Sequence, residues 1–156
     1  MIGAIIGGFL DDRAGSKTVI MVSLVLLLIG CGGILSVDKT YAFFVVEIAP
    51  KVAGSEPLSS PGEQVFLAFA ILVGLVAAPV QAASRALLAR LAPPEQMTQY
   101  FGLFAFSGKV TAFMAPFLVA TVTAATGDQR MGMSAIAFFL IAGLLLMLPV
   151  RDRLRP

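Results

Sequence analysis

Few residues of this chain could do chemistry. The sequence has eleven Lys and Arg, nine Asp and Glu, no His and a single cysteine, Cys31. Without His the chain lacks the usual general base and the commonest metal ligand, and a lone cysteine forms neither an internal disulfide nor a CxxC site. The net charge of +2 is too small for a nucleic-acid-binding surface. We therefore predict no enzyme activity, no cofactor, no metal and no nucleic-acid partner.

One cluster of charges lies in the string GFLDDRAGSK, which separates two apolar stretches. Asp12 precedes the second stretch, where the free N–H groups and the positive dipole end of a starting helix favour a carboxylate. Arg13 and Lys17 can pair with it. Gly8 allows two backbones to approach, and Gly15 admits the positive φ that a sharp turn often needs. The string predicts a tight turn between two helices, and the alternative is a short polar loop.

A second feature is Lys109, which interrupts an otherwise uncharged stretch, 99–125. It lies about ten residues, or roughly 15 Å of helix, from the nearer end, and an unpaired ammonium there costs several kcal/mol or more. The acidic residues all lie in loops or at the ends of apolar stretches. The partner of the Lys109 ammonium is then an acidic residue outside this chain, water in a central cavity, or an anionic group of a solute. We assign Lys109 and Ser107 to a polar pathway between helices. The alternative is a helix that starts later, so that Lys109 lies nearer its end.

A polar stripe lies near the end of another apolar stretch. Gln81, Ser84 and Arg85 share one face at helical spacing and could line a gate. The alternative is an ordinary helix end, from which the charge of Arg85 extends toward water.

Small residues predict two sites of close helix packing. Gly3 and Gly7 form a GxxxG step, and Gly108, Ala112 and Pro116 form a small face on the helix of the intramembrane lysine. We interpret both as packing sites rather than as contacts with a solute.

The elements that position these residues follow from hydropathy. The chain is 58% hydrophobic and 13% charged, with a mean hydropathy of +0.94, whereas a soluble surface needs roughly 25–35% charged residues. About 20 apolar residues cross a bilayer as a helix, and an open strand cannot do so. Four stretches are long enough: 18–37, 64–84, 99–125 and 131–150. We predict an all-α membrane protein with four transmembrane helices.

The first ten residues are also apolar but cover only about 15 Å as a helix. Charges follow this segment instead of preceding it, which argues against a signal peptide. We therefore expect residues 1–10 to be an N-terminal half-span, and the chain to be a fragment or to start further upstream.

Basic residues near the ends of the stretches are distributed unevenly. Seven lie on one side: Arg13, Lys17, Arg85, Arg90, Arg151, Arg153 and Arg155. Three lie on the other: Lys39, Lys51 and Arg130. The excess predicts a cytoplasmic C-terminus and an extracytoplasmic loop over 38–63. Abundant Ala, Leu, Gly and Arg suggest a bacterial source, and hence the bacterial cytoplasmic membrane.

The charged turn resembles the G-x-x-x-D-[RK]-x-G-[RK]-[RK] signature of the major facilitator superfamily. It matches at five positions: Gly8, Asp12, Arg13, Gly15 and Lys17. Ser16 departs from the basic residue usual at its position. Three strings, QAASRALLARL (81–91), FGLFAFSGKVTA (101–112) and TGDQR (126–130), are similar to the branch of the autophagy-related vacuolar amino-acid effluxer and its bacterial relatives.

This resemblance implies a twelve-helix secondary transporter, of which the chain corresponds to the end of helix eight through helix twelve. It implies alternating access, with the turn at Asp12 and Arg13 stabilising one state. A small amino-acid-like solute, the lipid bilayer and the missing N-terminal half are the expected partners. The alternative is a non-transporting membrane module, either a truncated remnant or a helical subunit that assembles with a partner.

Overall fold

The computed structural model describes residues 9, 13–36, 41–42, 46–47 and 60–150. Apart from Phe9, the predicted half-span over residues 1–10 lies outside these residues, and so do Gly3, Gly7, Gly8 and Asp12. Four long helices make up the described chain: α2 (Ser16–Ser36), α3 (Pro61–Leu91), α4 (Met97–Thr126) and α5 (Gln129–Met147). A 3-10 turn, η1 (Pro94–Gln96), joins α3 to α4, and two short antiparallel strands, β1 (Tyr41–Ala42) and β2 (Val46–Glu47), follow α2.

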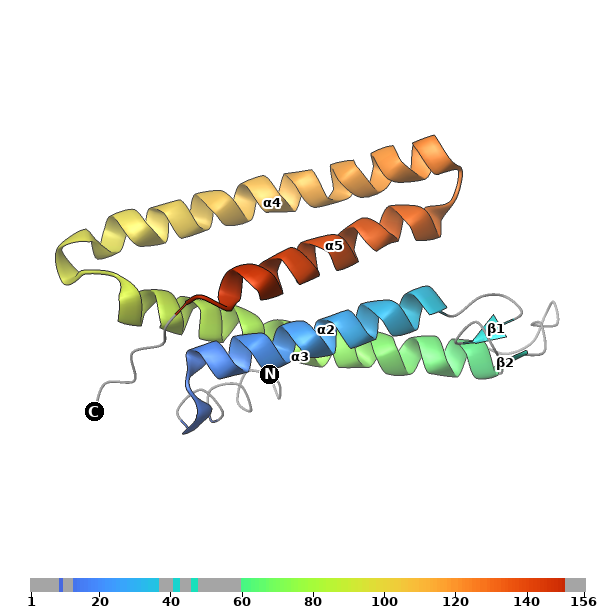
Figure 1. The fold of residues 1–156 in the computed structure, drawn as a ribbon, viewed down its shortest axis with the longest axis horizontal. Helices are drawn as coiled ribbons and strands as arrows, with labels where there is room; N and C mark the ends of the chain where they lie inside the picture. The colour runs from blue at the N-terminus through green and yellow to red at the C-terminus, as the bar shows by residue number, and fades with distance from the viewer. Residues whose placement is uncertain (1–8, 10–12, 37–40, 43–45, 48–59, 151–156) are drawn as a thin grey trace.

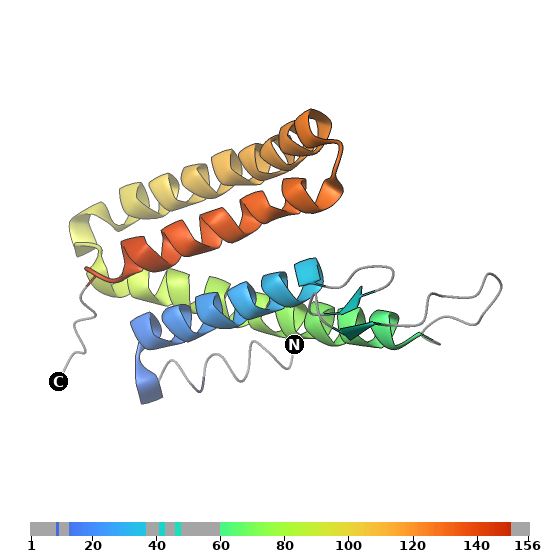
Figure 2. The same cartoon turned by 45° about the vertical axis from the view of Figure 1, so that its right-hand side comes forward.

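The four helices run up and down in succession, as Figures 1 and 2 show. By length and composition each is able to cross a membrane, which confirms the predicted all-α membrane fold. Helix α2 packs on α3, α4 packs on α5, and α5 packs on α2. The start of α2 and the end of α5 therefore meet at one end of the bundle, and α4 lies on its outer side.

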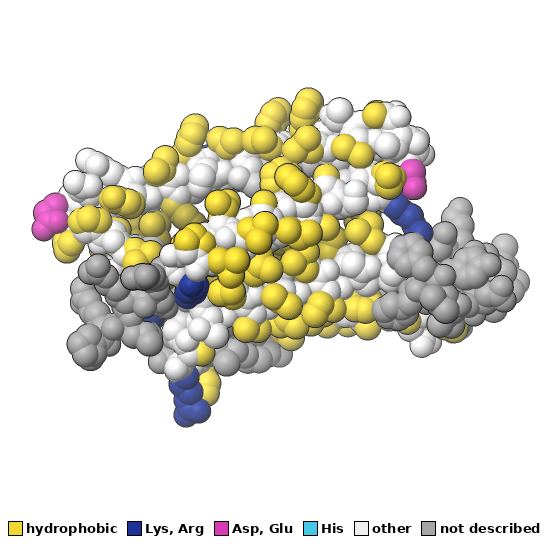
Figure 3. Space-filling view, viewed as in Figure 1, with side chains coloured by type: hydrophobic (Ala, Val, Ile, Leu, Met, Phe, Trp, Pro, Cys, Tyr) yellow, Lys and Arg dark blue, Asp and Glu magenta, His cyan; other side chains and the backbone are white. Residues whose placement is uncertain are grey.

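The surface of the bundle is predominantly apolar. Figure 3 shows hydrophobic side chains over the middle of the bundle and charged side chains toward its two ends. Buried apolar residues are few in the described part of the chain, and α4 contains none. A chain whose hydrophobic groups face outward over the length of four helices is suited to lipid or to further helices, not to water.

The α2–α3 pair is packed tightly because α2 presents glycine where α3 approaches. A Cβ placed on Gly30 would lie 2.6 Å from Cγ2 of Val73, and one on Gly33 would lie 2.5 Å from three ring carbons of Phe69. The missing side chains let the two backbones come close together, which is the common device of membrane helix pairs.

Helix α3 is longer than the uncharged stretch predicts, since it continues past Ser84 to Leu91. Hydropathy marks where charge begins, whereas the hydrogen-bonded helix continues to the pair Pro93–Pro94, and the single Pro79 within α3 does not end it. Ala92 donates to the carbonyl of Leu88 and then turns to extended backbone, as a residue before proline prefers. Arg85 and Arg90 therefore lie on α3 itself, not in the loop that follows it.

Caps define the other ends. Ser60 accepts a hydrogen bond from the Glu63 N–H at 3.3 Å, and Pro61 occupies the first turn of α3. Between α4 and α5, Gly127 has a φ of +69°, and the Asp128 carboxylate accepts from the Arg130 N–H at 2.9 Å. Gly127 thus ends α4 and Asp128 caps the start of α5, so the two helices are joined by a tight turn.

Candidate functional site

The turn before α2 adopts the backbone that its glycine predicts. Gly15 has a φ of +81°, a conformation that disfavours residues with a Cβ. Its carbonyl accepts the first hydrogen bond of α2, from the Val19 N–H at 3.2 Å. The prediction of a positive φ at Gly15 is confirmed, and the helix therefore begins directly after the sharp turn.

Lys17 joins this turn to the far end of the described chain. Its Nζ donates a hydrogen bond of 2.9 Å to the carbonyl of Leu148, which caps the C-terminus of α5. The last carbonyls of a helix lack partners and carry the negative end of its dipole. Helix α5 has no basic residue in its own last turn. Lys17 therefore supplies the cation that this helix end lacks.

Apolar side chains support the same junction. Val19 and Ile20 of α2 are buried against Ala83 and Leu87 of α3. A second set of partly buried residues packs on this cluster: Leu24, Val80, Met147 and Val150. The start of α2, the end of α3 and the end of α5 thus form one packed unit around the turn.

Ser16 explains how this chain departs from the signature. The residue is fully buried, and its Oγ has no hydrogen-bond partner among the described residues. The basic side chain usual at this position would have to displace the atoms that cover Ser16. A small residue is therefore the one that the present packing accommodates.

Arg13, the other basic residue of the described turn, lies on the surface. Its guanidinium carbon is 4.4 Å from the ring centroid of Phe9, in a cation–π contact, and both residues are exposed. The sequence analysis did not predict this contact, and the possible pair of Arg13 with Asp12 stays a prediction because Asp12 lies outside the described residues.

The predicted polar stripe on α3 faces away from the buried cluster. Gln81 and Arg85 are exposed and form no hydrogen bond or ion pair with any described residue. Ser84 differs, because its hydroxyl donates to the Val80 carbonyl of the preceding turn at 2.6 Å. Only the amide and the guanidinium of the stripe are left to serve a gate.

On α4, Lys109 is exposed and Ser107 donates to the Phe104 carbonyl at 2.9 Å. The predicted small face, made of Gly108, Ala112 and Pro116, is exposed as well, and a Cβ on Gly108 would meet no atom within 4 Å. None of the described helices packs against this face. The predicted close packing would therefore involve a helix outside the described residues, and it stays a prediction.

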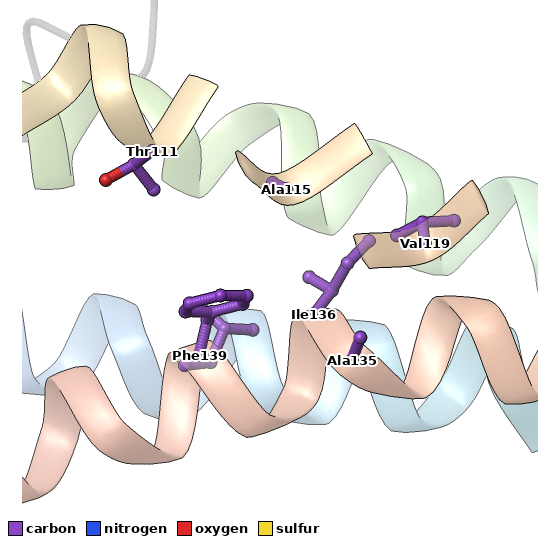
Figure 4. A pocket seen from close by; sticks show the side chains of 7 residues that line it. Thr111, Ala115, Val119, Ala135, Ile136 and Phe139 are labelled. Atoms are coloured by element: carbon purple, nitrogen blue, oxygen red, sulfur yellow. The ribbon is translucent and has the colours of Figure 1, made fainter. Parts of the chain in front are cut away.

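A small apolar pocket of about 100 Å³ lies between α4 and α5 (Figure 4). Seven residues line it: Thr111, Ala115, Val119, Ala135, Ile136, Phe139 and Leu140. Thr111 points its hydroxyl back to the Ser107 carbonyl at 2.9 Å, so it offers no free donor to an occupant. Sequence analysis did not identify this pocket, because its lining is indistinguishable from the apolar residues that surround it.

The closest helix contact of the hairpin was also missed. A Cβ on Gly132 of α5 would lie 2.7 Å from the Val119 carbonyl and would overlap Oγ1 of Thr123. The sequence gives no GxxxG step around Gly132 that would have identified it. Within the described ranges, no group of three or more His, Cys, Asp or Glu side chains gathers to hold a metal ion.

Comparison with known proteins connects this architecture to a family. A family model described as "Vacuole effluxer Atg22 like" matches residues 54–153, which contain α3, α4 and α5. Autophagy-related protein 22 of Cryptococcus neoformans var. neoformans serotype D (strain B-3501A) is 38% identical over 96 residues, which cover 62% of this chain and 16% of the relative.

A second relative is the uncharacterized MFS-type transporter YxiO of Bacillus subtilis (strain 168). It is 26% identical over 144 residues, which cover 92% of this chain and 28% of the relative. The chain thus spans less than a third of either protein. No solved structure matches it. The match over most of the chain, together with four helices able to span a membrane, identifies an integral membrane protein that belongs to the Atg22-like vacuole effluxer family.

Proposed function

We propose that this chain forms part of a major-facilitator-type secondary transporter that exports a small, amino-acid-like solute by alternating access. The family description, an effluxer, supports export, and the Bacillus relative supports the superfamily. The sequence has no GxxxxGK[ST] motif for nucleotide phosphates. An ion gradient, or the gradient of the solute itself, then drives transport.

The observation that carries this proposal is the junction of the turn with α5. Alternating access requires groups of helices that move as units, with contacts between them that differ from state to state. Gly15 directs the chain sharply into α2, and Lys17 binds α2 to the end of α5 through the Leu148 carbonyl. The ends of α2, α3 and α5 then move together, and the charged turn lies on their surface as the stabilising element of one state.

The first prediction concerns Lys17 in the full-length protein, reconstituted in vesicles and loaded with a mixture of amino acids. Lys17→Met removes the hydrogen bond to the Leu148 carbonyl, worth about 1 kcal/mol, and so loosens the unit that carries the charged turn. We expect efflux to fall at matched protein amounts, because the turn is then held less firmly relative to α5. Lys17→Arg keeps a cation within reach of the Leu148 carbonyl and should retain most of the efflux. Equal efflux by Lys17→Met and the unaltered protein would show that the junction has no part in transport, and vesicles that retain every amino acid would contradict the proposed solute.

The second prediction concerns orientation. We place the chain in a bacterial cytoplasmic membrane with its C-terminus in the cytoplasm, since the bacterial relative aligns with almost all of it and the basic excess lies at that end. Lys17, Arg85 and Arg90 lie at the end of the bundle where α5 finishes, and Arg130 lies at the opposite end. A reporter fused after Pro156 and one inserted within 56–62 should report opposite compartments. The same compartment for both would contradict this topology.

A further inference from the structure

Helix α4 is almost unpartnered along its length. None of its residues is buried, and it packs mainly against α5. Lys109 lies 12 residues after Met97 and 17 before Thr126, so roughly 18 Å and 25 Å of helix separate it from the two ends. Its ammonium is exposed and has no hydrogen bond or ion pair with a described residue. A charge more than three turns inside a membrane helix requires a partner at the same depth.

The described acidic side chains cannot be that partner. Glu63 lies in the first turn of α3, Glu95 in η1, and Asp128 caps the start of α5, whereas Glu47 belongs to β2 between α2 and α3. None of the four lies along the middle of a helix. Lipid phosphates lie at the depth of the helix ends, about three helical turns or more from Lys109.

Small residues flank Lys109 along one face of α4. Two small residues precede Lys109, Gly102 and Ala105, and two follow it, Ala112 and Pro116. Neighbouring members of this series are three or four residues apart, and all five residues are exposed. This spacing keeps them on one face and suits a helix that crosses at about 20°. A Cβ on Gly102 would meet nothing within 4 Å. We call these five residues the α4 seam.

The α4 seam is distinct from the surface that α5 occupies. The contact with α5 is made through Thr111, Ala115 and Val119, which line the pocket between the two helices. At 100° per residue, Lys109 lies roughly 120° around the helix from the middle of this contact. The seam is therefore a second helix-packing surface, which the described helices leave open.

We infer that the α4 seam is the docking surface for a further transmembrane helix of the full-length protein, and that this helix places an Asp or Glu carboxylate against Lys109. Charge complementarity selects the occupant, because lipid tails offer no group to pair with an ammonium. The small residues on either side let the two backbones approach closely enough for a direct pair. The inference rests on the proposed function only because it requires transmembrane helices beyond those described. The Cryptococcus and Bacillus relatives are several times longer than the segments that match this chain.

The third prediction tests this pair by stability, which does not depend on transport. In the purified full-length protein, each Asp and Glu of the other transmembrane helices is changed to Asn or Gln, alone and together with Lys109→Met. Removing one member of a charge pair in a nonpolar environment leaves the other uncompensated, whereas removing both does not. We expect Lys109→Met and one carboxylate variant each to lower the melting temperature by several degrees, and their combination to recover most of the loss. Additive effects for every carboxylate would overturn the inference, as would an unchanged melting temperature for Lys109→Met.

A second pair of variants tests the same inference by steric bulk, in case the charge variants fail to fold. Ala112→Leu adds bulk to the seam and should lower the melting temperature. Ala125→Leu adds the same bulk roughly 160° around α4 from Lys109, where the helix is also exposed, and should not. Equal effects of the two leucines would also overturn the inference. A stability coupling without measurable efflux would leave the docking surface in place and contradict only the transport proposal.

Discussion

Gly132→Ala is expected to destabilise the hairpin of α4 and α5, whereas Gly143→Ala on the same helix is expected to be neutral or slightly stabilising. The methyl group at Gly132 would lie 2.7 Å from the Val119 carbonyl and overlap Oγ1 of Thr123. A backbone carbonyl cannot rotate away, so α5 must move off α4. Overpacking of this kind costs about 1–3 kcal/mol. A Cβ at Gly143 meets nothing within 4 Å, and alanine is the better helix former by about 1 kcal/mol.

Unfolding of the purified protein in detergent, followed by helix content, measures both variants. The double variant Gly132→Ala with Thr123→Ala adds a second check. Oγ1 of Thr123 is buried and has no hydrogen-bond partner within the described part of the chain, so its removal breaks no described bond and opens space for the methyl group. Partial recovery is expected, because the contact with the Val119 carbonyl remains. A Gly132→Ala variant as stable as Gly143→Ala would show that α4 and α5 are further apart than described.

The four helices were predictable because lipid imposes a simple rule on composition. Uncharged stretches of about 20 residues must satisfy every backbone group internally, so each becomes a helix. Their ends follow other rules. Helix α3 runs past Arg85 to Leu91 because a long charged side chain does not interrupt backbone hydrogen bonds, whereas Pro93 and Pro94 do.

Contacts between helices were much less predictable. The sequence placed Gly15 correctly, since a positive φ is a property of one residue and its turn. It did not predict the hydrogen bond from Lys17 to the Leu148 carbonyl, 131 residues away. The possible pair of Lys17 with Asp12 stays a prediction, since Asp12 lies outside the described residues. The bond to Leu148 depends on which helix end packs beside α2, and that is set by the whole bundle.

The sequence also does not show which glycines lie at a close contact between helices. Gly32 and Gly33 are neighbours in a single string, GCGG, and no pattern separates them. In the structure a Cβ on Gly33 would lie 2.5 Å from three ring carbons of Phe69, whereas one on Gly32 would meet nothing within 4 Å. Equal distances to three ring atoms mean that the methyl group points at the face of the ring. A small rotation of Phe69 then brings no relief, so either the ring must adopt another rotamer or α3 must move away from α2.

Gly33→Ala is therefore expected to cost about 1–3 kcal/mol of stability, and Gly32→Ala to be neutral or slightly stabilising. Because α2 carries the turn and Lys17, a shift between α2 and α3 also disturbs the buried cluster of Val19 and Leu87. Efflux by Gly33→Ala should fall even at temperatures where the protein remains folded, and Gly32→Ala should transport normally. Detergent unfolding and vesicle efflux, measured on both variants, separate these effects. If the two alanines behave alike in both assays, the close α2–α3 contact at Phe69 is wrong, and the packing that positions the turn must be sought elsewhere.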